Sequence, residues 1–364
     1  MHITKIVITG GPCAGKSTAM SWIQNAFTEK GYTVLFVPET ATELISGGVC
    51  PWTCGTNAEY QKCQMQLQLT KERLFLQAAK TMSSEKILVV CDRGALDNRA
   101  YMNDAEFREV LLNVGENEIE LRDSYDAVFH LVTAAKGAEQ FYSNANNEAR
   151  YESIEEARAL DDRLLAAWSG HPHLRVIDNA TDFGDKMMRL ISEVSSFLDE
   201  PEPYEIERKF LIAYPDVEML ESIPGCRRVE IIQTYLKPRN GCEVRVRQRG
   251  AGGHYIYFET LKRDVAEPST GRRVEVERRL SKDEYLQLLM DADTTKHAIR
   301  KTRYCLAYDR QIFEIDVYPF WNDKAILEIE LHDEHDEIRF PPMLSILQEV
   351  TTDPQYRNSA LAAK

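Results

Sequence analysis

The stretch GGPCAGKST follows a short apolar segment expected to be a strand at 3–9 and begins a helix expected at 16–30. It matches the pattern GxxxxGK[ST], whose glycines let the backbone turn its N–H groups toward phosphate oxygens. The helix N-terminus adds partial positive charge there. The residues expected to bind the phosphates are Gly10, Gly11, Pro12, Cys13, Ala14, Gly15, Lys16, Ser17 and Thr18. We expect Lys16 to reach the β- and γ-phosphates and act in catalysis, and the Ser17 hydroxyl to ligate Mg²⁺.

Beyond this loop, short apolar runs that predict strands alternate with segments of helical periodicity. Further strands are expected at 33–37, 86–91, 127–132 and 174–177, and helices at 57–82, 153–168 and 182–198. Strands that alternate with helices are typical of a parallel sheet. The first part of the chain is therefore predicted to be an α/β domain with helices on both faces of the sheet.

Three charged residues end the second and third of these strands. Asp92 and Arg93 follow the strand at 86–91, and Glu39 follows the strand at 33–37. Ligands of open α/β sheets bind at this edge. Asp92 can order Mg²⁺ or accept a proton from an attacking hydroxyl, and Arg93 can hold an acceptor phosphate or carboxylate. For Glu39, an acid near a helix N-terminus is the competing interpretation.

A lid is predicted at 136–165, with Arg150 and Arg158 as catalytic candidates. A lid arginine can stabilise the charge that develops on a transferred phosphoryl group. The alternative is a solvated helix face, which these arginines would share with Glu155, Glu156, Asp161 and Asp162. The segment 178–183 follows the last strand, where this architecture often packs the nucleotide base.

At these motifs, the first 198 residues resemble the small-molecule P-loop kinases, near nicotinamide-riboside kinase and thymidylate kinase. They resemble more specifically the ATP/GTP-binding AAA-like domain of that group. The motifs are GGPCAGKST, PET, CDRG, the RYE…EEA lid and DNATDF. The resemblance implies phosphoryl transfer from ATP or GTP with Mg²⁺. The segment from Ala41 to Glu72 carries no chemistry that the sequence assigns, so the acceptor is left open.

The acidic, proline-containing stretch LDEPEPY at 198–204 is typical of a linker and predicts domains at 1–199 and 203–364. Beyond it the hydrophobic period changes to two, and short helices fit at 216–222, 282–290 and 343–350. Eight strands are expected, which suggests a closed antiparallel barrel in a β-rich α+β domain. They lie at 204–213, 228–236, 242–249, 255–262, 272–280, 296–305, 311–317 and 325–331.

Charged residues recur at alternate positions of these strands and therefore share strand faces. Arg245 and Arg247 alternate with Val244 and Val246, for example. The other sets are Glu205, Glu207 and Lys209; Arg273, Glu275 and Glu277; Lys301 and Arg303; Glu314 and Asp316; and Glu328 and Glu330. Ordinary half-exposed strands are the alternative. If these faces point into a barrel, the lumen must be wet, because isolated buried charges are very costly. Its cations suit polyphosphate oxygens and its carboxylates suit divalent metals.

Glu205 to Lys209 reads EIERK and matches the ExExK signature of the CYTH, or triphosphate tunnel metalloenzyme, family, which the chain resembles over about 204–361. The resemblance implies an eight-stranded tunnel that hydrolyses or cyclises triphosphates with Mg²⁺ or Mn²⁺. It implies metal ligands at Glu205, Glu207, Glu328 and Glu330, joined by Glu275, Glu277 and Asp316. Asp316 and Glu277 are also candidates for orienting water in catalysis. It implies triphosphate contacts at Lys209, Arg245, Arg247, Lys262, Arg273, Lys301 and Arg303.

The order of the two domains also resembles the animal TRPL translocation defect protein family, which implies a rival function. In that alternative, ATP or GTP regulates a binding module whose barrel recognises anionic phospholipid or phosphoinositide headgroups without catalysis. The sequence carries no polybasic stretch that would favour firm attachment to an anionic membrane surface. We therefore expect a P-loop phosphotransferase or NTPase fused to a metal-dependent triphosphatase.

Composition excludes several other classes. The 364 residues carry 44 Lys+Arg and 58 Asp+Glu, a net charge of −14 without a long basic run, so we expect no nucleic-acid partner. Hydrophobic residues make up 43% of the chain, yet no run approaches the roughly 20 apolar residues that cross a bilayer. The eight cysteines form no CxxC pair, which favours reduced thiols and a cytoplasmic location.

Overall fold

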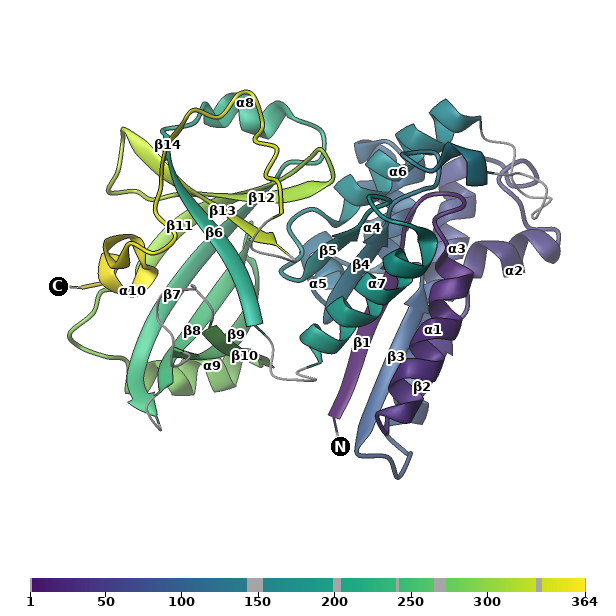
Figure 1. The fold of residues 1–364 in the computed structure, drawn as a ribbon. Helices are drawn as coiled ribbons and strands as arrows, with labels where there is room; N and C mark the ends of the chain where they lie inside the picture. The colour runs from purple at the N-terminus through teal and green to yellow at the C-terminus, as the bar shows by residue number, and fades with distance from the viewer. Residues whose placement is uncertain are drawn as a thin grey trace. The chain divides into compact units, whose positions relative to one another are not determined.

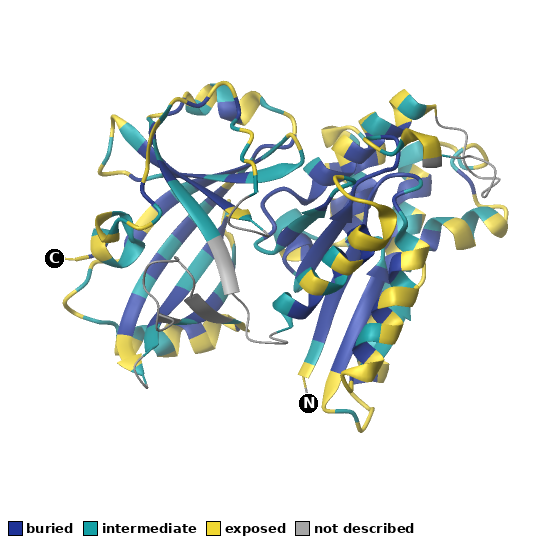
Figure 2. Cartoon of the chain, in the orientation of Figure 1, coloured by how far each residue is buried: buried dark blue, intermediate teal, exposed yellow. Residues whose placement is uncertain are grey.

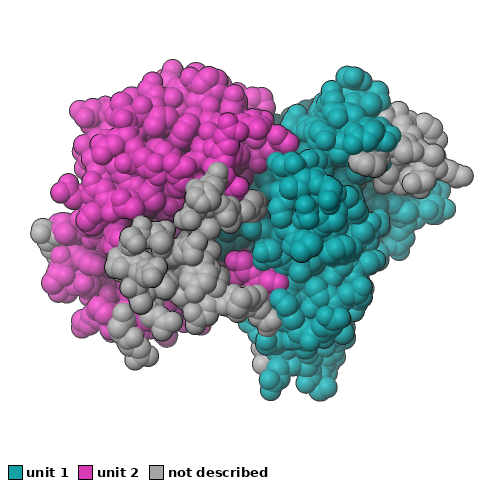
Figure 3. Space-filling model, in the orientation of Figure 1, with its two compact units in different colours: residues 1–194 teal, residues 195–364 magenta. Residues whose placement is uncertain are grey.

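The computed structural model describes residues 2–142, 153–198, 204–239, 242–264, 273–331 and 336–363. The chain divides into two compact units, Met1–Val194 and Ser195–Lys364, which Figure 3 shows in different colours. Each unit has its own sheet and its own core.

Unit 1 is built around a five-stranded parallel sheet with the strand order β2-β3-β1-β4-β5 (Figure 1). The strands are β1 (His2–Thr9), β2 (Thr33–Val37), β3 (Lys86–Asp92), β4 (Ala127–Leu131) and β5 (Leu174–Ile177). The α-helices are α1 (Lys16–Glu29), α2 (Thr40–Ser46), α3 (Asn57–Ala79), α4 (Asp104–Val114), α5 (Glu118–Arg122), α6 (Ile154–Trp168) and α7 (Phe183–Phe197). Two 3₁₀ helices, η1 (Ala95–Tyr101) and η2 (Glu139–Phe141), complete the described part. The predicted parallel α/β sheet is confirmed.

The strands of this sheet are apolar along most of their length because helices cover the sheet, as the dark blue of Figure 2 shows. Residues 4–9 of β1 and 87–91 of β3 are buried. The carboxyl ends of β1, β2 and β3 therefore meet at one sheet edge, where the loop after β1 and the residues after β2 and β3 come together.

Unit 2 is an antiparallel sheet with the strand order β10-β9-β8-β7-β11-β12-β13-β6-β14. The strands are β6 (Tyr204–Ala213), β7 (Arg227–Arg239), β8 (Cys242–Ala251), β9 (His254–Asp264), β10 (Arg273–Leu280), β11 (Ile299–Tyr308), β12 (Gln311–Val317), β13 (Lys324–Leu331) and β14 (Ile346–Glu349). The helices are α8 (Val217–Ser222), α9 (Lys282–Leu288), η4 (Leu289–Asp291), η5 (Pro354–Tyr356) and α10 (Asn358–Leu361). An additional pairing joins β10, at one end of this order, to β6, which precedes β14 at the other end, and so closes a barrel.

The segment 343–350 was expected to be helical, and this prediction is wrong, because Ile346–Glu349 forms strand β14. On one edge, β6 pairs with β13 along its length. On its other edge, β10 pairs only with Tyr204 and Glu205, which leaves the later residues of β6 open. Strand β14 pairs there with Phe210–Ile212, so the backbone bonds of that edge decide the conformation.

Two apolar clusters of the barrel lie on the face opposite to the alternating charges, where short helices cover them. One cluster joins Phe210, Leu306 and Phe313 to Leu220 of α8. Another joins Val244, Val246 and Leu280 to Tyr285 of α9. The opposite strand faces, which carry the alternating charges, therefore point into the barrel lumen.

Candidate functional site

In unit 1 the loop between β1 and α1 depends on two glycines with positive φ. Gly10 has φ +138°, and a Cβ there would lie 2.0 Å from the backbone oxygen of Leu131. Gly15 has φ +94° and caps α1 without any side-chain hydrogen bond, so the first N–H groups of the helix are available to an anion. Ser17 and Thr18 are exposed in the first turn of this helix.

The side chain of Lys16 folds back onto the loop backbone. Its Nζ donates hydrogen bonds to the backbone oxygens of Gly10, at 2.9 Å, and Gly11, at 3.0 Å. Burial, and then the neighbouring Arg93 guanidinium, lower the pKa of Lys16 from 10.5 to about 8. A phosphate beside Lys16 would favour the ammonium form and could replace the two backbone acceptors.

Two buried charged residues that the sequence did not single out for catalysis or binding hold the loop from outside. Asp161 Oδ1 accepts a hydrogen bond from the Gly11 N–H at 2.9 Å. Lys186 Nζ donates to the backbone oxygens of Ala14, at 3.0 Å, and Val132, at 2.7 Å. The alternative that placed Asp161 on a solvated helix face is wrong for this residue, which is 1% exposed because it caps the loop backbone.

The charged residues expected at the sheet edge do lie together. Arg93, at φ +67°, donates from Nε to Glu39 Oε1 at 2.5 Å. Burial raises the pKa of Glu39, but Arg93 outweighs it and the pKa falls to about 2. Burial raises the pKa of Asp92, and its Oδ1 has no hydrogen-bond partner among the described residues. Asp92 is therefore the stronger base of the two carboxylates.

The predicted lid is described in part. Arg158 donates from Nε to the Ala135 backbone oxygen at 2.6 Å and from its terminal nitrogen to Glu139 at 2.8 Å. Arg150 lies outside the described residues. In the segment 178–183, Asn179 donates to the backbone oxygens of Thr133 and Lys136, each at 2.8 Å. The ring of Phe183 packs against Gly15.

In unit 2 one group of lumen charges forms a buried ion-pair network. Both oxygens of Asp316 accept from Arg303, at 2.7 and 2.6 Å, and Lys301 also pairs with Asp316. Arg303 reaches Glu328 at 2.5 Å and pairs with Glu314, and Lys209 pairs with Glu328. Burial opposes the charged form of Glu328, but its cations outweigh burial and hold its pKa well below the ordinary value. We infer that Asp316 and Glu328 position the cations around them.

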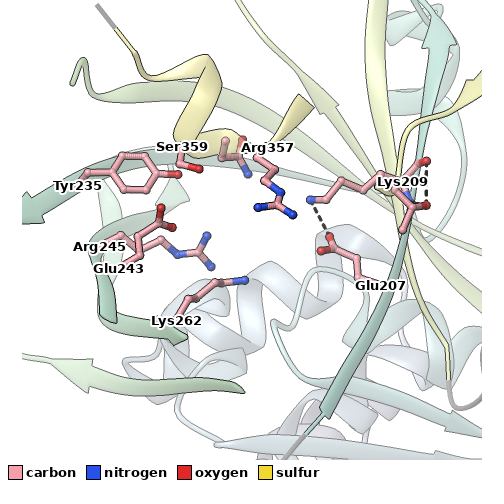
Figure 4. A pocket seen from close by; sticks show the side chains of 10 residues that line it. Glu207, Lys209, Tyr235, Glu243, Arg245, Lys262, Arg357 and Ser359 are labelled. Carbon is pink, nitrogen blue, oxygen red and sulfur yellow. Dashed lines mark hydrogen bonds and ion pairs between the residues drawn. The ribbon is translucent and has the colours of Figure 1, made fainter. Parts of the chain in front are cut away.

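A second group of lumen charges lines a pocket that is partly open to solvent, and its empty space of about 630 Å³ includes some of that solvent (Figure 4). Four of its residues are cationic: Lys209, Arg245, Lys262 and Arg357. The other lining residues are Glu207, Tyr235, Glu243, Thr351, Asn358 and Ser359. Arg357 and Asn358 belong to the C-terminal segment TTDPQYRN at 351–358, to which the sequence analysis assigned no role. Its arginine, followed by polar residues beyond the last strand, was the signal that could have identified it.

The pocket balances acids against cations. Glu207 lies 3.1 Å from Lys209 Nζ, and it faces Glu330 directly across the β6–β13 pair. Burial and then Glu328 raise the pKa of Glu207. Like charges that lie directly opposite on neighbouring strands repel each other. A cation between Glu207 and the exposed Glu330 would relieve that repulsion.

Another ion pair in the barrel joins two of the remaining predicted residues, Arg247 and Glu277. Arg247 donates to Glu277 at 2.6 Å, and Thr260 donates to the same Glu277 oxygen at 2.9 Å. The side chains of Glu205, Arg273 and Glu275 lie outside the described part of the structure. No group of three or more His, Cys, Asp or Glu side chains within the described ranges lies together as a metal site. A metal held by Glu207 and Glu330 would need further ligands from the substrate or from water.

Comparison with known proteins agrees with these two units. Residues 5–186 match a family described as AAA domain, and residues 203–345 match one described as CYTH domain. An inorganic triphosphatase from Nitrosomonas europaea is 36% identical over 162 residues, which are 43% of this chain and 96% of that protein. The chain therefore belongs to the AAA domain family, and a CYTH domain follows its AAA domain.

Solved structures also match part of the chain. The crystal structure of an inorganic triphosphatase is 30% identical, covers 44% of this chain and 95% of its own, and has a TM-score of 0.29. A protein from Pyrococcus horikoshii OT3 is 21% identical, and the match covers 36% of this chain and 80% of that protein, with a TM-score of 0.28.

Within the described ranges, no helix has both the length and the apolar character that crossing a bilayer requires.

Proposed function

We propose that unit 2 hydrolyses a linear triphosphate with the help of a divalent metal ion. The observation that carries this proposal is the pocket that gathers Lys209, Arg245, Lys262 and Arg357 around one hollow inside the barrel. Four cations from three strands and the C-terminal segment can neutralise several phosphate groups in a row. The similarity to an inorganic triphosphatase supports the same class of substrate.

The acids of the pocket favour a hydrolase over a headgroup-binding module. Glu207 and Glu243 would repel a phosphate unless a cation lay between them and the ligand. Carboxylates are the protein ligands that Mg²⁺ and Mn²⁺ prefer, and we assign the metal to Glu207 and Glu330, with Glu205 as a further ligand. When bound there, the metal would polarise a phosphoryl group and lower the pKa of a water molecule.

The other residues of the pocket bind and orient. The cations hold the chain of phosphates in line and stabilise the charge of the departing pyrophosphate or phosphate. The network of Lys301, Arg303 and Asp316 keeps Lys209 and Glu328 in place. Hydrolysis breaks one P–O–P bond and adds the elements of water across it.

Phosphate release from tripolyphosphate tests this proposal. Full-length protein with Mg²⁺ or Mn²⁺ should release phosphate, EDTA should abolish the release, and Glu207→Gln should lower kcat/KM at least about 10²-fold. Lys16→Ala, in the other unit, is the matched control and should leave the release unchanged. The headgroup-binding alternative would be supported if no linear triphosphate were cut while phosphoinositide vesicles still bound in EDTA.

For unit 1 we propose binding of ATP or GTP with Mg²⁺ and transfer of its γ-phosphoryl group. The specific observation is Asp92, whose buried Oδ1 lacks a partner in the part of the chain that is described, next to Lys16 and Arg93. A passive nucleotide site does not require a buried base there. Lys16→Ala should abolish binding of a fluorescent ATP or GTP analogue, and unchanged affinity would exclude this proposal.

A further inference from the structure

The pocket of unit 2 is bordered by the closing segment, residues 350–363, which follows β14. Near the start of this segment, the Thr351 hydroxyl accepts a hydrogen bond from the N–H of Lys209, on β6, at 3.0 Å. Near its end, the backbone oxygen of Ala362 accepts one from the N–H of His297, just before β11, at 2.7 Å. The closing segment is therefore bonded to the barrel near both of its ends and is a fixed part of the pocket wall.

The inner side of the closing segment packs on apolar residues of the barrel. Leu361 and Ala362 belong to a cluster whose barrel members are Tyr235, Ile299, Tyr318 and Ile326. Ile299 and Ile326 lie two positions from Lys301 and Glu328 along their strands, so their side chains share the lumen-facing side. Tyr235 lines the pocket itself. The closing segment therefore packs on lumen-facing side chains next to the pocket.

Arg357, the pocket cation of the closing segment, is held through both of its neighbours in sequence. Tyr356 packs its ring against Trp321, with the ring centroids 6.3 Å apart. On the other side, the Oδ1 of Asn358 accepts a hydrogen bond from the Tyr318 hydroxyl at 2.7 Å. Both contacts come from the loop between β12 and β13. They fix the main chain on either side of Arg357.

Tyr318 is itself held firmly. It is 0% exposed, and its ring packs against those of Phe320 and Trp321, with centroids 5.2 and 5.1 Å away. Ile326 of β13 belongs to the same apolar cluster. A phenol ring fixed in this way offers its hydroxyl at one place only, and that place is the amide of Asn358.

This contact determines which end of the Asn358 amide is left for the pocket. Asn358 lines the pocket, as do Arg357 and Ser359 on either side of it in sequence (Figure 4), whereas Tyr318 is fully buried. An amide carries its oxygen and its NH₂ group on opposite sides of the terminal carbon. Because the oxygen is turned to Tyr318, the NH₂ group is the end of Asn358 that can donate to a ligand in the pocket.

We propose that Asn358 binds the triphosphate substrate of unit 2 by donating from Nδ2 to a phosphate oxygen, and that Tyr318 is a positioning residue that orients the amide for this contact. This inference rests on the proposed triphosphatase function. A phosphate oxygen is the fitting partner because it accepts hydrogen bonds, and because Arg357 beside Asn358 attracts the same group.

A neutral donor has a specific advantage in this pocket. Four cations and the acids Glu207 and Glu243 line it together, and a further charge would shift their balance. An amide N–H adds a hydrogen bond to the substrate without changing the net charge of the site. A carboxylate at the same position could still accept from Tyr318, but it would repel phosphate. Asn358→Asp therefore keeps the structural contact and reverses the proposed binding contact.

The first test measures the kinetics of phosphate release from tripolyphosphate by the full-length protein with Mg²⁺ or Mn²⁺. Asn358→Asp should raise the KM at least about tenfold, with a smaller effect on kcat and a thermal midpoint close to that of wild type. Asn322→Asp is the matched control, because it makes the same change at an exposed position of the loop between β12 and β13. It should keep the wild-type KM.

The second test separates a positioning role of Tyr318 from a purely structural one. Tyr318→Phe should raise the KM roughly threefold to tenfold with little change in kcat, because the amide loses the contact that orients it. Tyr304→Phe removes the bond of another buried tyrosine, to Glu221 at 3.1 Å, and should keep the wild-type KM. When Tyr318→Phe is combined with Asn358→Ala, the KM should equal that of Asn358→Ala alone, because Tyr318 acts through Asn358.

The outcomes separate this inference from the function on which it rests. If wild type cuts tripolyphosphate and Asn358→Asp keeps the wild-type KM, the assignment of Asn358 is overturned and the triphosphatase function stands. If the effects of Tyr318→Phe and Asn358→Ala on the KM multiply, Tyr318 acts by another route and its positioning role is overturned. If wild type neither binds nor cuts tripolyphosphate, the proposed function of unit 2 and this inference fail together.

Discussion

The chain holds two candidate phosphate sites that are built in opposite ways. In unit 1 the loop from Gly10 to Gly15 offers backbone N–H groups and one lysine, and its geometry depends on positive φ angles. In unit 2 the pocket offers side chains from several strands of the barrel and from the C-terminal segment. The first site therefore depends on the shape of the main chain and the second on the balance of side-chain charges.

This difference predicts which substitutions each site tolerates. A site made of backbone N–H groups, such as the loop of unit 1, is disrupted by any substitution that adds side-chain atoms at its glycines. The identity of most of its other side chains matters little. A charge-balanced site tolerates added bulk more easily but not the loss of one member of a pair, because its partner is then buried without compensation. The predictions below test this contrast.

The largest effect is expected for Gly10→Ala. The new Cβ would lie 2.0 Å from the Leu131 oxygen at φ +138°, and strain and overpacking cost about 1–3 kcal/mol each. Nucleotide binding should be undetectable, and the urea midpoint of the full chain should fall. Gly31→Ala is the matched control, with φ +83° but nothing within 4 Å, and it should keep full affinity. If Gly10→Ala and Gly31→Ala had equal effects on nucleotide binding, the loss of affinity would not come from a clash with the Leu131 oxygen.

Asp316→Asn tests the charge balance of the barrel. Asp316 is 0% exposed and accepts from both Lys301 and Arg303, so its neutralisation leaves buried cations uncompensated. We expect the free energy of unfolding to fall by about 3–5 kcal/mol, as measured by urea titration. Glu330→Gln, at an exposed position of the same face, should lose activity on tripolyphosphate with little loss of stability. If Asp316→Asn were as stable as wild type, the network would not support the pocket.

Arg357→Ala should have a smaller, purely kinetic effect. This residue reaches the pocket from the C-terminal segment rather than from the sheet. Removing a charge-assisted phosphate contact of about 1.5–3 kcal/mol should raise the KM for tripolyphosphate roughly 10- to 100-fold. The thermal midpoint should hardly change, and Arg357→Lys should recover part of the affinity. An unchanged KM would place Arg357 outside the substrate site.

The smallest effect is a pH dependence of nucleotide binding. Lys16 has a pKa of about 8 in the free protein, and the bound phosphates require its charged form. Affinity should therefore fall as the pH rises, by about tenfold between pH 7 and 9. Calorimetry in two buffers of different ionisation enthalpy should show proton uptake on binding near pH 8. Lys16→Arg, which does not titrate there, should remove the dependence.

The alternation of charged residues in unit 2 predicted which side chains of its strands point into the barrel lumen. Arg245, Lys301 and Arg303 are 6–8% exposed and point into the barrel because strand parity determines side-chain direction. The strand Ile346–Glu349 was missed because its conformation comes from the open edge of β6, and four residues carry little pattern of their own. Local sequence does not encode which edge remains open.

Residues that act at long range were the hardest to predict. Lys186 on α7 looks like an ordinary helix lysine, yet it is 2% exposed and binds backbone oxygens 172 and 54 positions away. Asp161 lies among other acids on α6, and only the fold brings it to the Gly11 N–H. The glycine motif, in contrast, is contiguous, and for that reason its sequence alone located the loop.

The pairing partners of strand β6 bear on the order in which the chain folds. It is the first strand of unit 2, and its partners β13 and β14 come from the last 41 residues, while β10 also meets it across a long separation. During synthesis, unit 1 can complete its sheet as soon as β5 has emerged, but the barrel must wait for β13 and β14. Such distant pairings slow folding and leave edges open in the meantime. The nascent chain therefore carries a finished first unit and an unclosed second one until β14 has emerged.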